Sequence, residues 1–351
     1  MPSSTDGAGD RALDTLLLPF ASGALRWPEN GHVLFLRARC NAALREVETD
    51  HWICQQTFRP DADALLRAGL RVAETVAETF PLVLMLPPRQ REESRALMAR
   101  ALGHLAPNGT LVAGMLNEEG ARSGEADLAR LAGPMHSLSK NRARVFWTAA
   151  PDAGAMDRSL MTEWAMLDRP RPIADGRFVS RPGLFAWDRI DAASKLLADH
   201  LPEDLAGHGA DLGAGYGYLA ERVLARCPRV GALDLYEAES RGLELARTNL
   251  ATAASRVPLD FLWHDVTRGL PRRYDFIVSN PPFHHGRPGQ PELGRAFLAA
   301  AGAALTPGGR GWFVANRHLP YEAELKSGFG TLRSVVERDG FKVIEAVKTR
   351  A

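Results

Sequence analysis

The sequence predicts an α/β protein in which two related domains follow one another along the chain. Three observations support this. The 351 residues exceed what one hydrophobic core ordinarily organises, short apolar segments alternate with helical ones in the second half, and a fainter copy of that pattern lies in the first half. We assign residues 1–150 and 177–351 to the two domains. Residues 151–176 contain the closely spaced prolines of Asp168-Arg-Pro-Arg-Pro172, which predict an irregular linker.

The composition is that of a globular protein. With 45% hydrophobic and 24% charged residues, the chain is neither fibrous nor disordered. No apolar run approaches the roughly 18 to 20 residues that span a bilayer, so we expect no membrane partner. Asp6 and Asp10 stand where a signal peptide would carry cations. We therefore expect a cytoplasmic protein.

Charge and cysteine content give no positive evidence for a nucleic-acid partner, a disulfide framework or a metal site. The net charge of +1 lacks the basic imprint that phosphate binding usually leaves on a protein, although it does not exclude a nucleic-acid partner. Cys40, Cys54 and Cys227 are scattered and form no Cys-x-x-Cys spacing. Neither a disulfide framework nor a metal site is therefore expected.

The second half carries the clearer strand pattern. Strands that alternate with helices form a mostly parallel sheet covered on both faces, and ligands bind such sheets at the carboxyl ends of the strands. The residues directly after each strand are thus the first candidates for a site. The predicted strands are Gly209–Leu212, Val230–Leu235, Leu259–Trp263, Tyr274–Ser279 and Gly311–Ala315.

The first half repeats part of this pattern, which predicts an internal duplication. Three consecutive segments align between the halves: Phe80–Pro88 with Tyr274–Pro282, Arg91–His104 with Leu293–Ala304, and Leu105–Ala113 with Leu305–Phe313. The copies differ where chemistry is expected. Asn280 corresponds to Leu86, and no glycine-rich loop follows the early strand Val33–Leu36. We therefore interpret the first domain as a chemically silent copy.

A glycine-rich loop follows the first strand of the second domain. Asp211 precedes Gly213, Gly215 and Gly217, and glycines at this spacing permit backbone torsions and a close approach to a ligand that other residues forbid. The dinucleotide fingerprint Gly-x-Gly-x-x-Gly requires glycine at position 218, which is Tyr218. The loop instead resembles motif I of the class I S-adenosylmethionine-dependent methyltransferases, which implies that cofactor. A tight turn in another α/β fold is the alternative.

Two acids compete for a ribose contact at the end of the next strand, about twenty residues after the loop. Asp234 lies inside the strand and Glu237 falls at its end. Counting back from Ala246-Arg-Thr-Asn249, which resembles the usual helix end after this strand, favours Glu237.

The most specific motif is Asn280-Pro-Pro-Phe283, directly after a predicted strand. An exocyclic ring amine attacks a methyl group poorly because its lone pair is delocalised into the ring. The Asn280 side-chain oxygen and the Pro281 carbonyl can accept both amine hydrogens. Pro282 helps to fix the backbone, and the Phe283 ring can stack on a flat substrate. The motif thus predicts methylation of a planar amine, with a Pro-Pro turn without chemistry as the alternative.

Taken together, these motifs resemble the two-domain bacterial ribosomal RNA guanine-N2 methyltransferases of the RsmC and RlmG type. The resemblance covers Arg177–Arg350 well and the earlier half weakly. Further matching landmarks are Gly183-Leu-Phe-Ala-Trp-Asp-Arg-Ile-Asp191, Val314-Ala-Asn-Arg-His-Leu-Pro-Tyr321 and Phe341-Lys-Val343. The resemblance implies two tandem Rossmann-like methyltransferase domains, the N-terminal one degenerate and the C-terminal one catalytic.

The resemblance also implies an activity and a further contact. The activity is methyl transfer to the N2 amine of a guanine in ribosomal RNA, with 16S RNA or the small ribosomal subunit as partner. Asp265 stands where the family uses an acid to accept the adenine amino group. Phe283 followed by His284 resembles the guanine-N2 enzymes, whereas adenine-N6 and glutamine-N5 enzymes more often carry tyrosine at the former position.

Several alternatives stay open. Methylation of adenine N6 or of glutamine N5 is the nearest, and a non-catalytic ribosome-assembly factor is the next. Asn316, His318 and Tyr321 either line the base pocket or form an ordinary turn. Phe185 and Trp187 either close over the cofactor or belong to the core. His284 and His285 are adjacent and have no carboxylate or cysteine partner at ligand spacing, so we do not expect them to bind metal.

Overall fold

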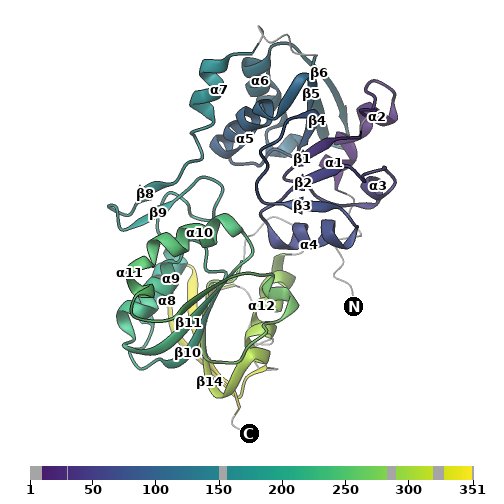
Figure 1. Ribbon diagram of the computed structural model, residues 1–351. Helices are drawn as coiled ribbons and strands as arrows, with labels where there is room; N and C mark the ends of the chain where they lie inside the picture. The colour runs from purple at the N-terminus through teal and green to yellow at the C-terminus, as the bar shows by residue number, and fades with distance from the viewer. Residues whose placement is uncertain (1–9, 30, 150–155, 283–289, 319–327, 350–351) are drawn as a thin grey trace. The chain divides into compact units, whose positions relative to one another are not determined.

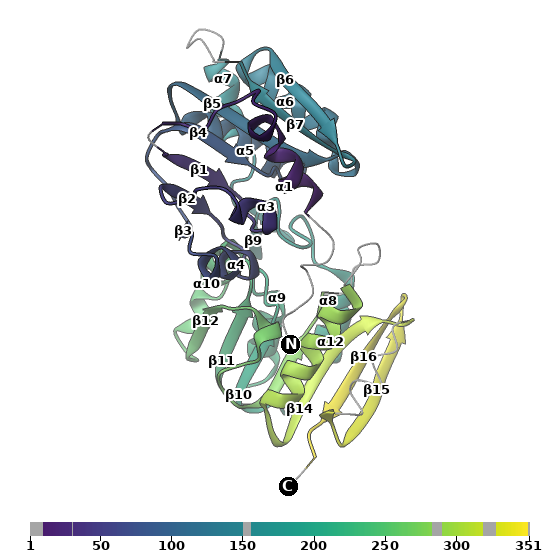
Figure 2. The same ribbon diagram turned by 90° about the vertical axis from the view of Figure 1, so that its right-hand side faces the viewer.

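The computed structural model describes residues 10–29, 31–149, 156–282, 290–318 and 328–349. The chain divides into two compact units, residues 1–169 and 170–351, and each is built around a seven-stranded sheet (Figures 1 and 2). We describe each unit by itself.

The N-terminal unit contains a sheet of strand order β3-β2-β1-β4-β5-β7-β6. Strands β3 to β5 are parallel in their pairings, and β7 and β6 are antiparallel to their neighbours. The strands are β1 (Val33–Leu36), β2 (Trp52–Gln55), β3 (Arg71–Ala73), β4 (Phe80–Met85), β5 (Leu105–Leu116), β6 (Met135–Lys140) and β7 (Ala143–Thr148). The helices are α1 (Arg11–Leu16), α2 (Leu18–Ala21), α3 (Ala42–Arg45), α4 (Arg59–Arg67), α5 (Arg91–Gly103), η1 (Asn117–Glu119), α6 (Ala121–Ala132) and α7 (Arg158–Trp164).

The C-terminal unit has a sheet of strand order β12-β11-β10-β13-β14-β16-β15, and Figure 2 shows its antiparallel edge, β16 and β15. The strands are β10 (Ala206–Leu212), β11 (Arg229–Glu237), β12 (Leu259–Trp263), β13 (Tyr274–Ser279), β14 (Leu305–Asn316), β15 (Thr331–Arg338) and β16 (Phe341–Val347), with a separate hairpin of β8 (Arg171–Ile173) and β9 (Phe178–Ser180). The helices are α8 (Ala192–His200), α9 (Tyr218–Arg226), α10 (Ser240–Asn249), α11 (Ala251–Ala254), η2 (Val266–Arg268) and α12 (Gln290–Ala304).

The two units repeat one topology, so the predicted tandem α/β fold is confirmed. Their strand orders match position by position, including the two antiparallel strands at one edge. Even the irregularities coincide: the β4–β5 register shifts between Phe80 and Leu82, and the β13–β14 register shifts between Tyr274 and Phe276. The last two strands of each unit are outside the predicted set. The edge strands β6 and β15 are mostly exposed and lack the continuous apolar runs of buried parallel strands.

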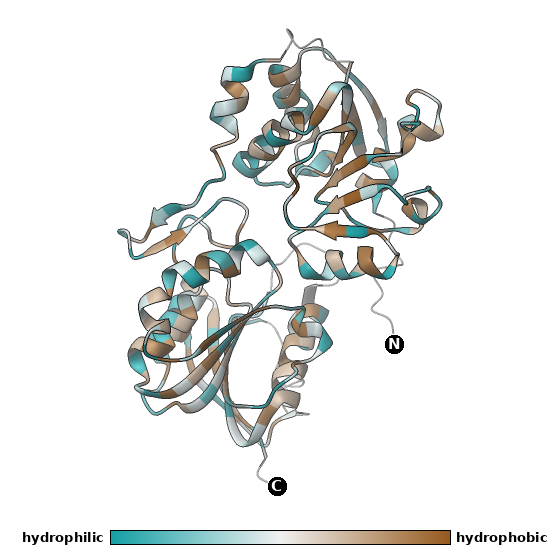
Figure 3. Ribbon diagram, viewed as in Figure 1, coloured by the Kyte–Doolittle hydropathy of each residue, from teal (hydrophilic) through white to brown (hydrophobic). Residues whose placement is uncertain are grey.

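Apolar side chains on both faces of each sheet form the core. In the C-terminal unit, α8, α9 and α10 cover one face and α12 covers the other. In the N-terminal unit, α5, α6 and α7 cover one face while α1, α3 and α4 cover the other. Figure 3 shows hydrophobic stretches along the central strands of the N-terminal sheet, as expected for parallel strands buried on both sides.

The segment expected to be an irregular linker, residues 151–176, is largely structured where it is described. It contains α7 and the first strand of the β8–β9 hairpin, and the boundary between the units falls after Arg169. Trp164, near the end of α7, is fully buried in the core beside α5. The expectation of an irregular segment is therefore wrong for these residues: α7 ends before the prolines, and Pro172 lies within the two-stranded hairpin, where a strand with a single partner tolerates proline.

Candidate active site

The glycine loop follows β10 and adopts the torsions expected of it. Gly213, Gly215 and Gly217 have φ angles of 75°, 56° and 90°, a region that favours glycine. A Cβ added at Gly215 would meet nothing within 4 Å, so open space lies against the backbone there. Gly217 precedes α9, whose first-turn N–H groups lack partners within the helix. The loop therefore offers a cradle in which a ligand can approach the main chain.

Strand register brings the loop together with two of the predicted site residues. Leu212 pairs with Tyr236 on one side and with Ser279 on the other. The next residues along the three strands, Gly213, Glu237 and Asn280, therefore lie together at the carboxyl ends of the strands. The Ser279 hydroxyl donates to the Leu212 carbonyl at 2.7 Å, which ties β13 to the start of the loop. Three predicted positions that are distant in sequence are thus neighbours.

Glu237 and Asp234 occupy different environments. Glu237 ends β11 and accepts hydrogen bonds from the Gly215 N–H at 2.8 Å and the Glu239 N–H at 2.9 Å. Burial raises its pKa above the ordinary range. Asp234 is 2% exposed and accepts from the Tyr274 hydroxyl at 2.6 Å and from Arg272 at 2.9 Å, with His208 at its other oxygen. The Asp234 carboxylate is therefore bound by interior side chains of its own unit, and Glu237 is the acid that contacts the glycine loop.

Asp211 is a buried carboxylate beneath the loop. It is fully buried, and neither side-chain oxygen has a hydrogen-bond partner within ordinary distance among the described residues. Burial raises the pKa of Asp211 to about 7. The charge of Glu237 adds to the rise, while the Ala220 N–H opposes it. Such an uncompensated group is costly, which is typical of positions that serve a ligand.

Asp265 lies beyond β12 at the same sheet edge. Its Oδ1 accepts from the Thr267 N–H at 3.0 Å and from the Thr267 hydroxyl at 2.6 Å, which caps η2. The register pairs Glu237 with Trp263, two residues before Asp265, and the His264 N–H donates to the Glu237 carbonyl at 3.0 Å. The structure thus places Asp265 in the turn that follows β12, the strand next to the one that Glu237 ends.

Asn280 follows β13, and its amide is held from one side. Nδ2 donates to Asp191 Oδ2 at 3.0 Å and to Ser194 Oγ at 2.9 Å, both at the start of α8. No described residue hydrogen-bonds its Oδ1. Pro281 is buried and Pro282 half-buried. Phe283, His284, His285 and Tyr321 lie outside the described residues.

The sequence interpretation missed Asp191 and Ser194 as site residues. Asp191 appeared there only as the end of a family landmark, although Asp-x-x-Ser before an apolar helix is a recognisable N-cap signal. Part of the landmark segment 183–191 also contacts the loop. Tyr216 donates to the Arg189 carbonyl at 3.2 Å. Trp187 contacts an apolar cluster beside Tyr216, whereas Phe185 is 53% exposed.

Two other predicted candidates lie at the same sheet edge. Asn316 ends β14, and His318 follows two residues later and is exposed. Neither makes a described side-chain hydrogen bond, so their assignment to a base pocket stays a prediction.

The N-terminal unit fills the corresponding place with side chains. Arg37 follows β1 and donates to Glu93 at 2.7 Å, and Glu93 on α5 is 3% exposed. Gln56, the counterpart of Glu237, donates to the Ala38 carbonyl at 2.7 Å. Leu86, the counterpart of Asn280, is buried. No glycine loop is present there, which accords with the interpretation of a chemically silent copy.

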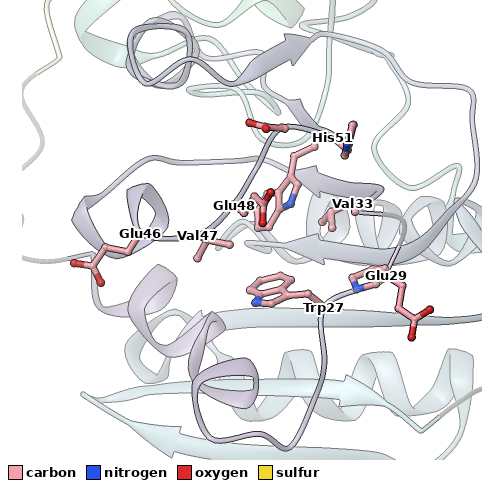
Figure 4. Close-up of a pocket in the computed structure, with 11 residues that line it drawn as sticks. Trp27, Glu29, Val33, Glu46, Val47, Glu48 and His51 are labelled. Atoms are coloured by element: carbon pink, nitrogen blue, oxygen red, sulfur yellow. The ribbon is translucent and has the colours of Figure 1, made fainter.

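A pocket of about 520 Å³ lies at the amino ends of the strands of that sheet (Figure 4). Its lining includes Val33 and Trp52, the first residues of β1 and β2, together with Trp27 and several carboxylates. Ligand sites of open α/β sheets lie at the carboxyl ends of the strands, so this pocket is not a counterpart of the glycine-loop site.

The described part of the chain contains no cluster of three or more potential metal ligands. No helix within it is long and apolar enough to cross a membrane.

Comparison with known proteins identifies the family. A family model described as Methyltransferase small domain matches residues 175–345. Ribosomal RNA small subunit methyltransferase C of Klebsiella pneumoniae subsp. pneumoniae is 30% identical over 335 residues, which cover 92% of this chain and 94% of the relative. The protein of the same name from Pseudomonas paraeruginosa is 31% identical over 262 residues, covering 74% of this chain and 76% of the relative. This chain belongs to the ribosomal RNA small subunit methyltransferase C family.

A solved structure supports the fold of the family across both units. The T. thermophilus 16S rRNA N2 methyltransferase (RsmC), determined in complex with AdoMet and guanosine, superposes with a TM-score of 0.78 at 24% identity, covering 97% of this chain and 93% of that one. The family therefore shares the two tandem α/β domains described above.

Proposed function

We propose that this protein transfers a methyl group from S-adenosylmethionine to the exocyclic N2 amine of a guanine in 16S ribosomal RNA. The observation that carries the proposal is the Asn280 amide at the sheet edge, one strand from the glycine loop and with its Nδ2 already bound to Asp191 and Ser194. Family membership supplies the class of RNA.

The residues around the loop fit S-adenosylmethionine. The open space at Gly215 admits the cofactor against the backbone. Glu237 retains lone pairs beyond its two N–H contacts and accepts the ribose hydroxyls, while Asp265 accepts the adenine amino group. Asp211, in its ionised form, favours the ammonium group of the amino-acid end. Bound there, the cofactor supplies a methyl group activated by its sulfonium charge.

Asn280 and Pro281 act on the guanine amine. The Asn280 side-chain oxygen and the Pro281 carbonyl accept the two amine hydrogens, which orients the nitrogen and favours the tetrahedral geometry that develops during attack. Pro282 restricts the backbone at this turn. We assign stacking on the base to Phe283, which lies outside the described residues. No general base is needed, because a methylated cationic nitrogen loses its proton readily.

Labelled transfer tests the proposal. Purified protein is incubated with methyl-labelled S-adenosylmethionine and separated ribosomal subunits from a strain lacking the activity, and the labelled nucleoside is identified after digestion of the RNA. We expect N2-methylguanosine in 16S RNA. Label in N6-methyladenosine or in a protein glutamine would replace the substrate assignment, and binding of subunits without any labelled product would indicate a non-catalytic assembly factor.

Asn280→Ala is the matched variant for this assay. Because Asn280 contacts the amine and not the cofactor in this scheme, methyl transfer falls below detection while the dissociation constant of S-adenosylmethionine changes less than about threefold. Calorimetric titration measures the second quantity. Loss of cofactor binding with retained turnover would contradict the assignment.

A further inference from the structure

We infer that Asp191 and Ser194 are positioning residues that hold the Asn280 amide with its oxygen turned toward the substrate. The inference rests on the proposed function and deepens it. Neither residue touches the reacting atoms; both act through Asn280.

The contacts form a small network at the first turn of α8. Asp191 Oδ2 accepts from the Ser194 N–H at 2.8 Å, which caps the helix, and from Asn280 Nδ2 at 3.0 Å. Ser194 Oγ accepts from the same Nδ2 at 2.9 Å. Both hydrogens of the Asn280 amide group thus have acceptors on α8.

This arrangement selects one of two amide orientations. The oxygen and nitrogen of an asparagine side chain are nearly the same size, so packing alone distinguishes them weakly. An ionised carboxylate can only accept, and a flipped amide would place oxygen against oxygen at Asp191. With Nδ2 fixed, Oδ1 is the end of the amide left for the substrate amine. Catalysis requires this end, because an NH2 group cannot accept the amine hydrogens.

The helix that carries the acceptors is anchored. Ala193, Leu196 and Leu197 are buried in the core, and α8 packs on β14 and β16. The acceptors therefore sit on a rigid element, as precise positioning of a side chain requires.

The N-terminal unit provides an internal comparison. Asp10 caps α1, which packs on β5 and β7 as α8 packs on β14 and β16, and accepts from the Leu13 N–H at 3.1 Å. Its other oxygen pairs with Arg39 at 3.0 Å, and Leu86 stands where Asn280 stands in the second unit. The capping aspartate thus serves helix structure in both units. In the C-terminal unit the capping aspartate, Asp191, also accepts a hydrogen bond from the side-chain amide of Asn280.

Variants at Asp191 separate capping from positioning. Serine is an equally good N-cap but is too short to keep both contacts, so Asp191→Ser retains the helix and releases Nδ2. We expect kcat for methyl transfer to fall about 10- to 100-fold, the range for loss of a hydrogen bond to a charged group. The dissociation constant of S-adenosylmethionine should stay within about threefold. Asp191→Asn keeps an acceptor oxygen and should restore at least about a third of wild-type kcat.

Two further variants complete the set. Ser194→Ala removes the second acceptor and should lower kcat about 3- to 10-fold, since a neutral hydrogen bond contributes less than a charged one. Asp10→Ser makes the same cap substitution in the N-terminal unit and should leave kcat unchanged. The inference is overturned if Asp191→Ser keeps wild-type kcat, if Asp10→Ser loses as much, or if Asp191→Asn is as impaired as Asp191→Ser.

A measurement without substrate distinguishes this inference from the proposed function. The side-chain NH2 signal of Asn280, assigned by its loss in Asn280→Ala after selective ¹⁵N-asparagine labelling, should exchange with solvent at least tenfold faster in Asp191→Ser than in the wild type. Absence of methyl transfer by the wild-type protein would refute the proposed function alone. Unchanged exchange of this signal in Asp191→Ser would refute the positioning role, whatever the activity.

Discussion

The buried carboxylate of Asp211 predicts that replacing it favours the folded state more at pH 8 than at pH 5. Replacing Asp211 with asparagine keeps the shape of the side chain and removes its charge. The group is fully buried beneath the glycine loop, and its pKa is raised from 3.8 to about 7 chiefly because burial penalises the charged form. In the unfolded chain the same carboxyl ionises near its ordinary pKa.

The sign and size follow from proton linkage. The folded state binds the proton more tightly than the unfolded chain, so stability is lost as pH rises from about 4 through about 7. The full difference corresponds to about 4 kcal/mol above pH 7, at about 1.36 kcal/mol for each pH unit. Between pH 5 and pH 8 the ionisation of Asp211 should therefore lower the free energy of unfolding by about 2 to 3 kcal/mol.

Urea denaturation followed by circular dichroism, at pH 5 and pH 8, measures this change. The difference in unfolding free energy between Asp211→Asn and wild type should shift in favour of the variant by about 2 to 3 kcal/mol at the higher pH. A buried amide lacks partners at both pH values, so its own penalty cancels in the comparison. Calorimetry at pH 8 should show weaker binding of S-adenosylmethionine to the same variant. An equal stability difference at both pH values would refute the reasoning.

Two further pairs of variants test the site. Glu237→Gln should weaken S-adenosylmethionine binding about 10- to 100-fold in calorimetry with little loss of stability. Asp234→Asn should leave that affinity within about threefold but destabilise the fold by about 2 to 4 kcal/mol, because Asp234 is buried among charged and hydroxyl partners; the opposite ranking would exchange the roles of the two acids. Gly215→Ala places a methyl group in open space and should abolish cofactor binding at a cost of about 1 kcal/mol in stability. Gly217→Ala forces a Cβ to 3.2 Å from Leu250 and should cost about 2 to 3 kcal/mol, measured by thermal denaturation; equal melting temperatures for the two variants would contradict this.

The pattern of apolar segments determined much of the fold in advance. Strands buried on both faces, such as β1 and β4, are continuous apolar runs bounded by turns, and this local signal predicts them without tertiary information. The repeat of Phe80–Met85 in Tyr274–Ser279 predicted two copies of one fold, and the matching strand orders confirm it. The edge strands β6 and β15, and helix α7 in the expected linker, lack such a signal. Their existence depends on a surface built by the rest of the chain.

The site shows the same division. The residue types and their order at Gly213, Glu237 and Asn280 were readable in the sequence, because turns after parallel strands meet at one edge. Only the tertiary structure decided that Asp234 is enclosed by Arg272 and Tyr274, and that Asp191 and Ser194 hold the Asn280 amide across 86 to 89 residues of chain. A sequence specifies which groups are available. Which of them become partners depends on distances between segments far apart along the chain, and these exist only once the core has packed.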